Sequence, residues 1–264
     1  MTTSDASASK PAPASAVRLR VVVYLAAAGT AAGIAVVVAL CVVWLLAATW
    51  AGGQPLAGIG GAVERLQSSF YANMAIITGF YVPILWLMWR AAKRLGASPM
   101  ARFFPRVPTK TILFALFAGA AISALWMLLE NVLTAQYGVD FKPSPYELAM
   151  FPATPVEFVV CIAVISLFGP FAEEFYFRGF LLGWLRRVAS TPVAIVLSAV
   201  AFALVHGFML IHPGTPGWVN SGEVFAAGLV MGVLAVRSGS LWPSYAFHVG
   251  YNTAVAVQAG LWPG

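Results

Sequence analysis

Charged residues are scarce in this sequence: they make up 9 % of the 264 residues, whereas an average soluble domain has about 25 %. Apolar residues make up 61 %. The composition excludes an ordinary soluble domain and indicates a polytopic membrane protein. The net charge of +6 does not indicate nucleic-acid binding, because the basic residues stand mostly at the ends of apolar runs and form no arrays with aromatic residues.

Several catalytic motifs are also missing. The chain has no His-Glu-x-x-His zinc motif, no Gly-x-Ser-x-Gly nucleophile motif and no glycine-rich nucleotide loop. Its aspartates are Asp5 and Asp140 alone, which excludes an intramembrane aspartyl dyad. Cys41 and Cys161 lie in apolar runs without partner spacing and are expected to be small buried residues. Hydrolysis within the membrane would therefore have to rely on glutamate and histidine.

Long apolar stretches account for most of the chain. About 20 apolar residues are enough to cross a bilayer as a helix. Seven stretches meet this requirement: 21–49, 72–90, 111–133, 155–184, 191–211, 219–236 and 241–261. The sequence therefore predicts an all-α polytopic protein of the cell membrane, a bundle of about seven transmembrane helices.

The polar residues divide this bundle into parts. Residues 1–20 are rich in Ser, Ala, Thr and Pro, which is typical of a disordered tail. Residues 21–154 form a predicted accessory transmembrane half of three spans plus loops. Polar residues within spans concentrate after residue 155, so residues 155–264 form the predicted functional core of four spans.

Orientation follows from the lysines and arginines, which occupy alternate connections. Basic residues precede the first span, fill the second connection, and follow the fourth and sixth spans. By the positive-inside rule, the N-terminus and these connections are cytoplasmic.

An acidic pair lies within the fourth span, where an ionised carboxylate costs about 3 kcal/mol or more unless it is paired or hydrated. Glu174 precedes Arg178 by four residues, the favourable order for an ion pair on one helix face. Glu173 points about 100° away and has no basic partner in its own helix. A desolvated carboxylate of this kind can act as a general base.

The alternative is that both glutamates lie at the cytoplasmic surface beside Arg186 and Arg187. Depth argues against it, because Glu173 stands 13 residues before Arg186, roughly 20 Å along a continuous helix. Gly169-Pro170 should kink this helix and leave carbonyl groups free.

Two histidines lie at comparable depth in later spans. Phe202 and His206 are four residues apart, as are His248 and Asn252, so each pair shares a helix face. A single intramembrane histidine is more often a hydrogen-bonding residue between helices than a catalyst. Two of them, each with a matched neighbour and level with Glu173, favour a functional site.

Three motifs occur in order on successive spans: Glu173-Glu174-x-x-x-Arg178, Phe202-x-x-x-His206 and His248-x-x-x-Asn252. Over about residues 155–258 the chain thereby resembles the CPBP family of intramembrane proteases. This family comprises the type II CAAX prenyl endopeptidases and bacterial relatives linked to bacteriocin processing and self-immunity. The first three spans carry no signature of the family.

The resemblance implies an α-helical bundle with a catalytic cavity open toward the cytoplasm and lipid. It also implies that Glu173 activates a water molecule with help from His206, while His248 and Asn252 stabilise the oxyanion. The neighbouring ion pair would hold the helix and set the field around Glu173. The expected partners are the lipid bilayer and a membrane-associated peptide or protein substrate, whose identity and prenylation the sequence does not reveal.

The family has been described both as metal-dependent and as metal-free. Glu173, His206 and His248 could supply a divalent metal site, such as a zinc site, with one open position. No carboxylate partner is evident for either histidine, which favours the metal-free alternative.

Two other classes of function remain open. A membrane immunity or scaffold protein could keep the same site only as a binding cavity. A proton-coupled transporter would also use glutamate and histidine, but the chain lacks interrupted helices in two matching halves. The sequence favours an intramembrane endopeptidase.

Overall fold

The computed structural model describes residues 28, 31–36, 38–39, 42–43, 68–94 and 98–261. The predicted tail of residues 1–20 lies outside the described residues. The first predicted span, 21–49, falls within them only at scattered helical positions between 28 and 43.

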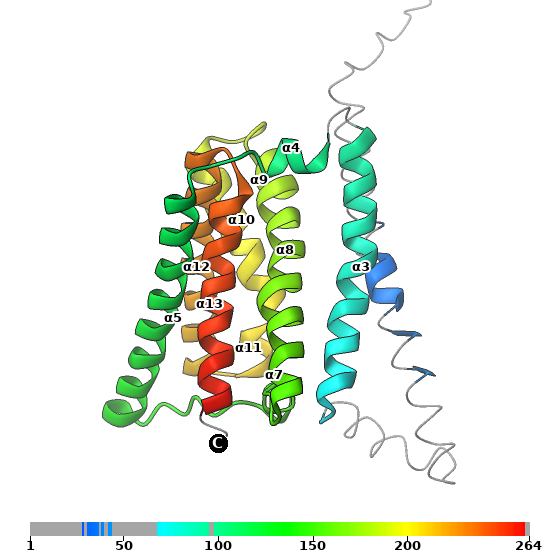
Figure 1. Ribbon diagram of the computed structural model, residues 1–264. Coiled ribbons are helices and arrows are strands. Elements are labelled where there is room, and N and C mark those ends of the chain that lie inside the picture. The colour runs from blue at the N-terminus through cyan, green and yellow to red at the C-terminus, as the bar shows by residue number, and fades with distance from the viewer. Residues whose placement is uncertain are drawn as a thin grey trace, which may run out of the picture.

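Every element assigned from residue 70 onward is a helix (Figure 1). The helices before the long central helix are α3 (Phe70–Arg94), α4 (Pro99–Phe103), α5 (Thr109–Tyr137) and α6 (Pro145–Leu148). The central helix consists of α7 (Pro155–Cys161), the π-helix η2 (Ile162–Phe168), α8 (Gly169–Glu174), the π-helix η3 (Phe175–Leu181) and α9 (Leu182–Leu185). It is followed by α10 (Thr191–His206), α11 (Phe208–Ile211), α12 (Thr215–Ser238) and α13 (Leu241–Leu261).

Five helical stretches of the described chain are long and apolar enough to cross a membrane. They are Phe70–Arg94, Thr109–Tyr137, Pro155–Leu185, Thr191–Ile211 and Thr215–Ser238. The prediction of an all-α polytopic membrane protein is confirmed. The seventh predicted span coincides with the helix α13. α13 is not among these five because polar residues such as Ser244, His248 and Asn252 lower its mean hydropathy. The count of seven spans stays a prediction.

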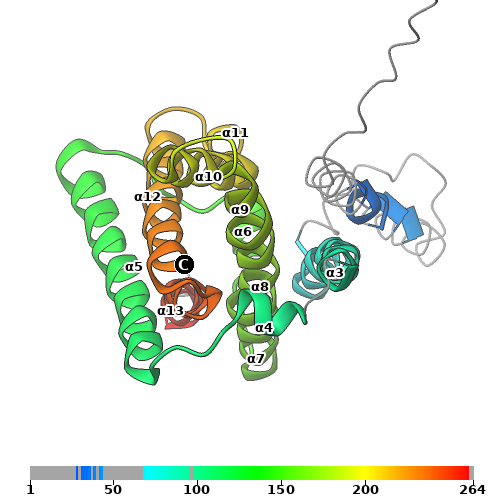
Figure 2. The same ribbon diagram turned by 90° about the horizontal axis from the view of Figure 1, so that it is seen from above.

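α13 lies at the centre of the bundle. In both views it stands between α5 and the long helix Pro155–Leu185 (Figures 1 and 2), and it contacts both as well as α12. α10 packs against α12. α3 stands on the side of the long helix away from α5 and contacts α7, η2, α8 and η3. This arrangement surrounds the Glu173-Glu174 segment with α3 on one side and α13 on the other.

Two glycines allow α5 and α13 to approach closely. A Cβ atom at Gly119 of α5 would lie 2.0 Å from the carbonyl oxygen of Phe247 in α13. A Cβ atom at Gly250 of α13 would lie 1.9 Å from the carbonyl oxygen of Leu116 in α5. Small residues at such crossings let membrane helices pack backbone to backbone. The contact fixes α13 on both sides of His248.

The long helix widens into π turns before and after the glutamates. The Gly169 N–H donates to the Val164 carbonyl, five residues back, at the end of η2, and the Leu182 N–H donates likewise to Phe177 at the end of η3. Single π turns within α-helices occur frequently at functional sites. The predicted distortion near Gly169-Pro170 thus takes the form of a widened helix.

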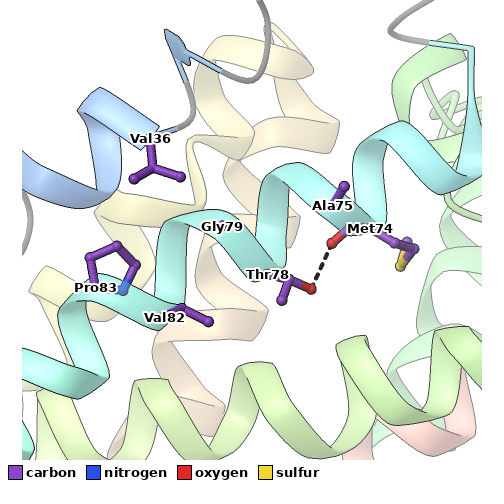
Figure 3. A pocket seen from close by; sticks show the side chains of 7 residues that line it. All are labelled: Val36, Met74, Ala75, Thr78, Gly79, Val82 and Pro83. Atoms are coloured by element: carbon purple, nitrogen blue, oxygen red, sulfur yellow. Dashed lines mark hydrogen bonds between the residues drawn. The ribbon is translucent and has the colours of Figure 1, made fainter. Parts of the chain in front are cut away.

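One face of α3 lines an open apolar groove of about 530 Å³ (Figure 3). Its lining residues are Val36, Met74, Ala75, Thr78, Gly79, Val82 and Pro83. The Thr78 hydroxyl donates a 2.8 Å hydrogen bond to the Met74 carbonyl. This bond satisfies the hydroxyl within its own helix, so the groove has an apolar lining.

Candidate active site

The predicted ion pair between Glu174 and Arg178 is present and buried. Arg178 Nη1 lies 2.9 Å from Glu174 Oε1, and both side chains are completely buried. Arg178 Nη2 donates a second hydrogen bond, of 3.3 Å, to the Gly228 carbonyl in α12. The guanidinium carbon also lies 4.2 Å from the centroid of the Phe202 ring. The pair therefore ties the long helix to α10 and α12.

His248 connects the two glutamates. Its Nδ1 lies 3.1 Å from Glu174 Oε1, and its Nε2 lies 3.6 Å from Glu173 Oε2. An ionised carboxylate only accepts hydrogen bonds, so Nδ1 must carry the proton in its bond to Glu174. In the neutral ring, Nε2 then presents its lone pair toward Glu173.

Glu173 has a second partner from outside the predicted core. The Tyr81 hydroxyl of α3 donates a hydrogen bond to Glu173 Oε1. The Glu173 side chain is 15 % exposed. The alternative of two solvated surface carboxylates does not hold, since Glu174 is fully buried and both oxygens of Glu173 face protein groups.

Phe202 and His206 form the neighbouring wall. The Phe202 ring is almost fully buried, and its centroid lies 4.6 Å from that of His206 and 5.6 Å from that of His248. His206 Nδ1 lies 2.7 Å from the Phe202 carbonyl, so Nδ1 carries the proton and the neutral ring keeps its lone pair on Nε2. The contacts described for Glu173 are with Tyr81 and His248, and its pairing with His206 stays a prediction.

Asn252 is held by a carbonyl that the π-helix frees. Its Nδ2 donates a 2.9 Å hydrogen bond to the carbonyl of Ile165 in η2. The Gly169 N–H, the α-helical donor for that carbonyl, bonds to Val164 instead. Pro170, which would supply the donor one residue later, has no N–H. The predicted free carbonyl is therefore Ile165, and it anchors Asn252 one helical turn after His248.

Sequence reasoning missed Tyr81 and the Gly228 carbonyl. Tyr81 lies within the predicted span 72–90, in a part of the chain without motifs, and an aromatic residue there resembles any other core residue. A backbone carbonyl has no signature in the sequence. Only the packing of α3 and α12 against the long helix identifies these two groups.

A resident metal ion does not fit the side chains present. In the part of the chain that the structure describes, no three His, Cys, Asp or Glu side chains are grouped so that they could hold one. Glu173, His206 and His248 are thus not assembled as a ligand set. The expectation that neither histidine has a carboxylate partner is wrong for His248, because its Nδ1 lies 3.1 Å from Glu174 Oε1. No catalytic step is assigned to a metal.

Comparison with known proteins identifies the segment that carries these residues. The family model described as Type II CAAX prenyl endopeptidase Rce1-like matches residues 155–254, less than half of the chain. Neither the curated proteins nor the solved structures give a match. The matched segment holds all three motifs, which confirms the family predicted from them. Residues 155–254 of this multi-pass membrane protein are therefore similar to the Rce1-like family of type II CAAX prenyl endopeptidases.

Proposed function

We propose that the protein is an intramembrane endopeptidase that hydrolyses a peptide bond of a membrane-associated protein or peptide with water activated by Glu173. The family match supports a peptidase function. The observation that carries the proposal is the position of Glu173: one carboxylate oxygen faces His248 at 3.6 Å, and Arg178 pairs with Glu174 instead.

Charge balance gives the site one exchangeable proton. With His248 neutral, Arg178 and the two ionised glutamates sum to −1. Two lone pairs would then face each other between His248 Nε2 and Glu173 Oε2. One proton shared by these two groups removes that repulsion and makes the cluster neutral, which the membrane interior favours. In general acid–base catalysis, Glu173 would take a further proton from the attacking water, and the pair would give one proton to the leaving amine.

The remaining motif residues surround this pair. The Nε2 lone pair of His206 can accept a proton, so His206 can serve as a second proton acceptor in addition to Glu173. His248, when protonated at Nε2, and the second N–H of the Asn252 amide are donors suited to the oxyanion of the tetrahedral intermediate. The bond from Asn252 to Ile165 fixes the amide before substrate binds. This division of roles follows the family expectation and is part of the proposal.

The proposed orientation places the N-terminus in the cytoplasm. The α3–α4–α5 connection, which holds several basic residues, stands at the same end of the bundle as α9 (Figure 1). The exposed Arg186 and Arg187 directly follow α9. Among the described residues, the opposite end carries Asp140 and Lys142, which follow α5, and Glu157 of α7 (Figure 1). This distribution agrees with the positive-inside rule.

The test is a comparison of wild type and Glu173→Ala in the full-length protein. Removing a general base should lower the cleavage rate by about 10²–10⁴-fold. Membrane-associated peptides from cells carrying either form are compared by mass spectrometry, and substrates appear as fragments that only the wild type produces. A quenched farnesylated CAAX peptide and its unprenylated counterpart test the substrate class that the family name suggests.

Asp140→Asn is the matched control, because Asp140 is exposed in a loop and pairs only with Lys142 among its described ion pairs. It should cleave at the wild-type rate. A folded Glu173→Ala protein that cleaves as fast as wild type would refute the proposal. An immunity or scaffold role would give a different result. The cellular phenotype of the wild type would persist in Glu173→Gln but would be lost when residues on the bundle surface are substituted.

A further inference from the structure

α3 contributes to the site although it lies outside the matched segment of residues 155–254. Its Tyr81 donates a hydrogen bond to Glu173 across a sequence separation of 92 residues. The Tyr81 ring lies 6.4 Å from the Phe168 ring in an edge-to-face arrangement. A Cβ atom at Gly169 would lie 3.8 Å from Tyr81 Cε2. The tyrosine thus rests on the junction of η2 and α8 and reaches the carboxylate from there.

We propose that Tyr81 is a positioning residue for Glu173, so that the active site extends onto α3 beyond the family domain. The inference rests on the proposed function, because it assigns Glu173 the role of base. Tyr81 acts through Glu173 and is not itself assigned a contact with the reacting atoms.

The geometry explains why the carboxylate needs a hydroxyl. A glutamate side chain has three torsions, and the last of them is broad, so one fixed oxygen is required to direct the other. Tyr81 holds Oε1, which leaves Oε2 facing His248 at 3.6 Å. Without the hydroxyl, the carboxylate loses the contact that holds Oε1 and thereby directs Oε2 toward His248.

The neutrality of the donor is equally important. Arg178 neutralises Glu174 through a charged pair, which removes that carboxylate as a base. The Tyr81 hydroxyl holds one oxygen of Glu173 through a single neutral hydrogen bond and adds no positive charge. The two adjacent glutamates thereby receive different partners: a cation from their own helix and a hydroxyl from α3.

α3 is fixed where it carries this hydroxyl. Its buried residues Ile84, Met88, Ala91 and Ala92 pack in one hydrophobic cluster with Phe175, which directly follows the two glutamates. Within the described chain, α3 therefore contacts the long helix both at the carboxylate and at the residue after the acidic pair. This packing sets the distance that the Tyr81 hydroxyl has to span.

A double-mutant cycle tests the proposal without any substrate. The unfolding midpoint of the purified full-length protein in lipid nanodiscs is measured for wild type, Tyr81→Phe, Glu173→Ala and the double variant. Tyr81→Phe keeps the ring and removes only the hydroxyl. It should lower the midpoint by about 2–4 °C in the wild type and leave it unchanged in the Glu173→Ala background.

Tyr71→Phe is the matched control, because Tyr71 is an exposed tyrosine on the same helix. It should leave the midpoint unchanged in both backgrounds. An equal loss from Tyr81→Phe in both backgrounds would mean that the hydroxyl does not act through Glu173, and it would overturn the inference.

If Glu173→Ala does not fold, infrared difference spectra of wild type and Tyr81→Phe replace the cycle. A carboxylate stretching band should shift in Tyr81→Phe and not in Tyr71→Phe, and the absence of that shift would overturn the inference.

Kinetics on the quenched farnesylated CAAX peptide separate positioning from binding. Tyr81→Phe should lower kcat about 10-fold with KM within two-fold of wild type. If the wild type cleaves the peptide and Tyr81→Phe has the same kcat, the proposed role of Tyr81 is contradicted. If the cycle shows coupling but the wild type cleaves neither probe nor any cellular peptide, the contact stands and the proposed function fails.

Discussion

The segment of residues 155–254 and the helices before it differ in what their sequences reveal. The C-terminal segment carries all three motifs and the family match, and its helices place the two glutamates, Arg178 and both site histidines. α3 and α5 carry no motif. They nevertheless supply the hydroxyl that holds Glu173 and the glycine against which α13 packs.

This difference separates two kinds of requirement. Acid–base chemistry requires particular residue types at fixed spacings, so it leaves a pattern in the sequence. Holding those residues in place requires a complementary packing surface, a single hydroxyl or a glycine. Many different sequences meet these requirements, so they leave no recognisable pattern. In α3 and α5 these contacts come from single residues, namely Tyr81 and Gly119.

The largest effect on stability is expected within the C-terminal segment. Arg178→Ala leaves Glu174 buried without its cation and should lower the free energy of unfolding by about 3–5 kcal/mol. Chemical unfolding in mixed micelles measures the loss. Arg186→Ala, at an exposed arginine after the same helix, should change it by less than about 0.5 kcal/mol. Equal losses from both variants would contradict a buried structural pair.

A somewhat smaller effect tests whether the accessory half sets the site. Gly119→Ala introduces a Cβ atom 2.0 Å from the Phe247 carbonyl, so α5 and α13 must separate. We expect a loss of about 3 kcal/mol, together with reduced cleavage because α13 carries His248. Gly183→Ala is the control, since a Cβ atom there meets no atom within 4 Å. If Gly119→Ala behaves like Gly183→Ala, α5 does not position α13.

The smallest effect concerns the free carbonyl of η2. Asn252→Ala removes the donor to Ile165 and should cost about 1–2 kcal/mol, whereas Gln258→Ala, at an exposed amide on the same helix, should cost almost nothing. Pro170→Ala restores a backbone N–H near that carbonyl, so Asn252→Ala should cost less in this background. The measurement is the unfolding midpoint of the three single variants and of the Pro170→Ala/Asn252→Ala double variant. If Asn252→Ala lowers the midpoint equally in the wild-type and Pro170→Ala backgrounds, Pro170 does not free the carbonyl.

The span positions and the Glu174–Arg178 pair could be predicted because they follow from local rules. Apolar length predicts α3, α5 and α10 to within a few residues, and a four-residue spacing places Glu174 and Arg178 on one helix face. The effect of Gly169-Pro170 was predicted as a distortion that frees carbonyls, since proline lacks an N–H.

Other features depend on contacts between distant segments. The sequence predicts that His248 and Glu173 converge, but not that His248 also bonds to Glu174 through Nδ1. Tyr81 is one of eight tyrosines, and nothing local distinguishes it. The π turns have no signature in the sequence either, because α and π hydrogen bonding differ only by one residue in register.

The two π turns have a consequence for how the long helix accommodates change. Each inserts the equivalent of one extra residue into an α-helix, and one residue corresponds to about 100° of rotation. The stretch Gly169–Glu174 lies between these turns, so the direction in which its side chains point differs from that of a continuous α-helix. Losing one residue from η2 would leave a regular, well-packed helix whose acidic side chains face the wrong neighbours.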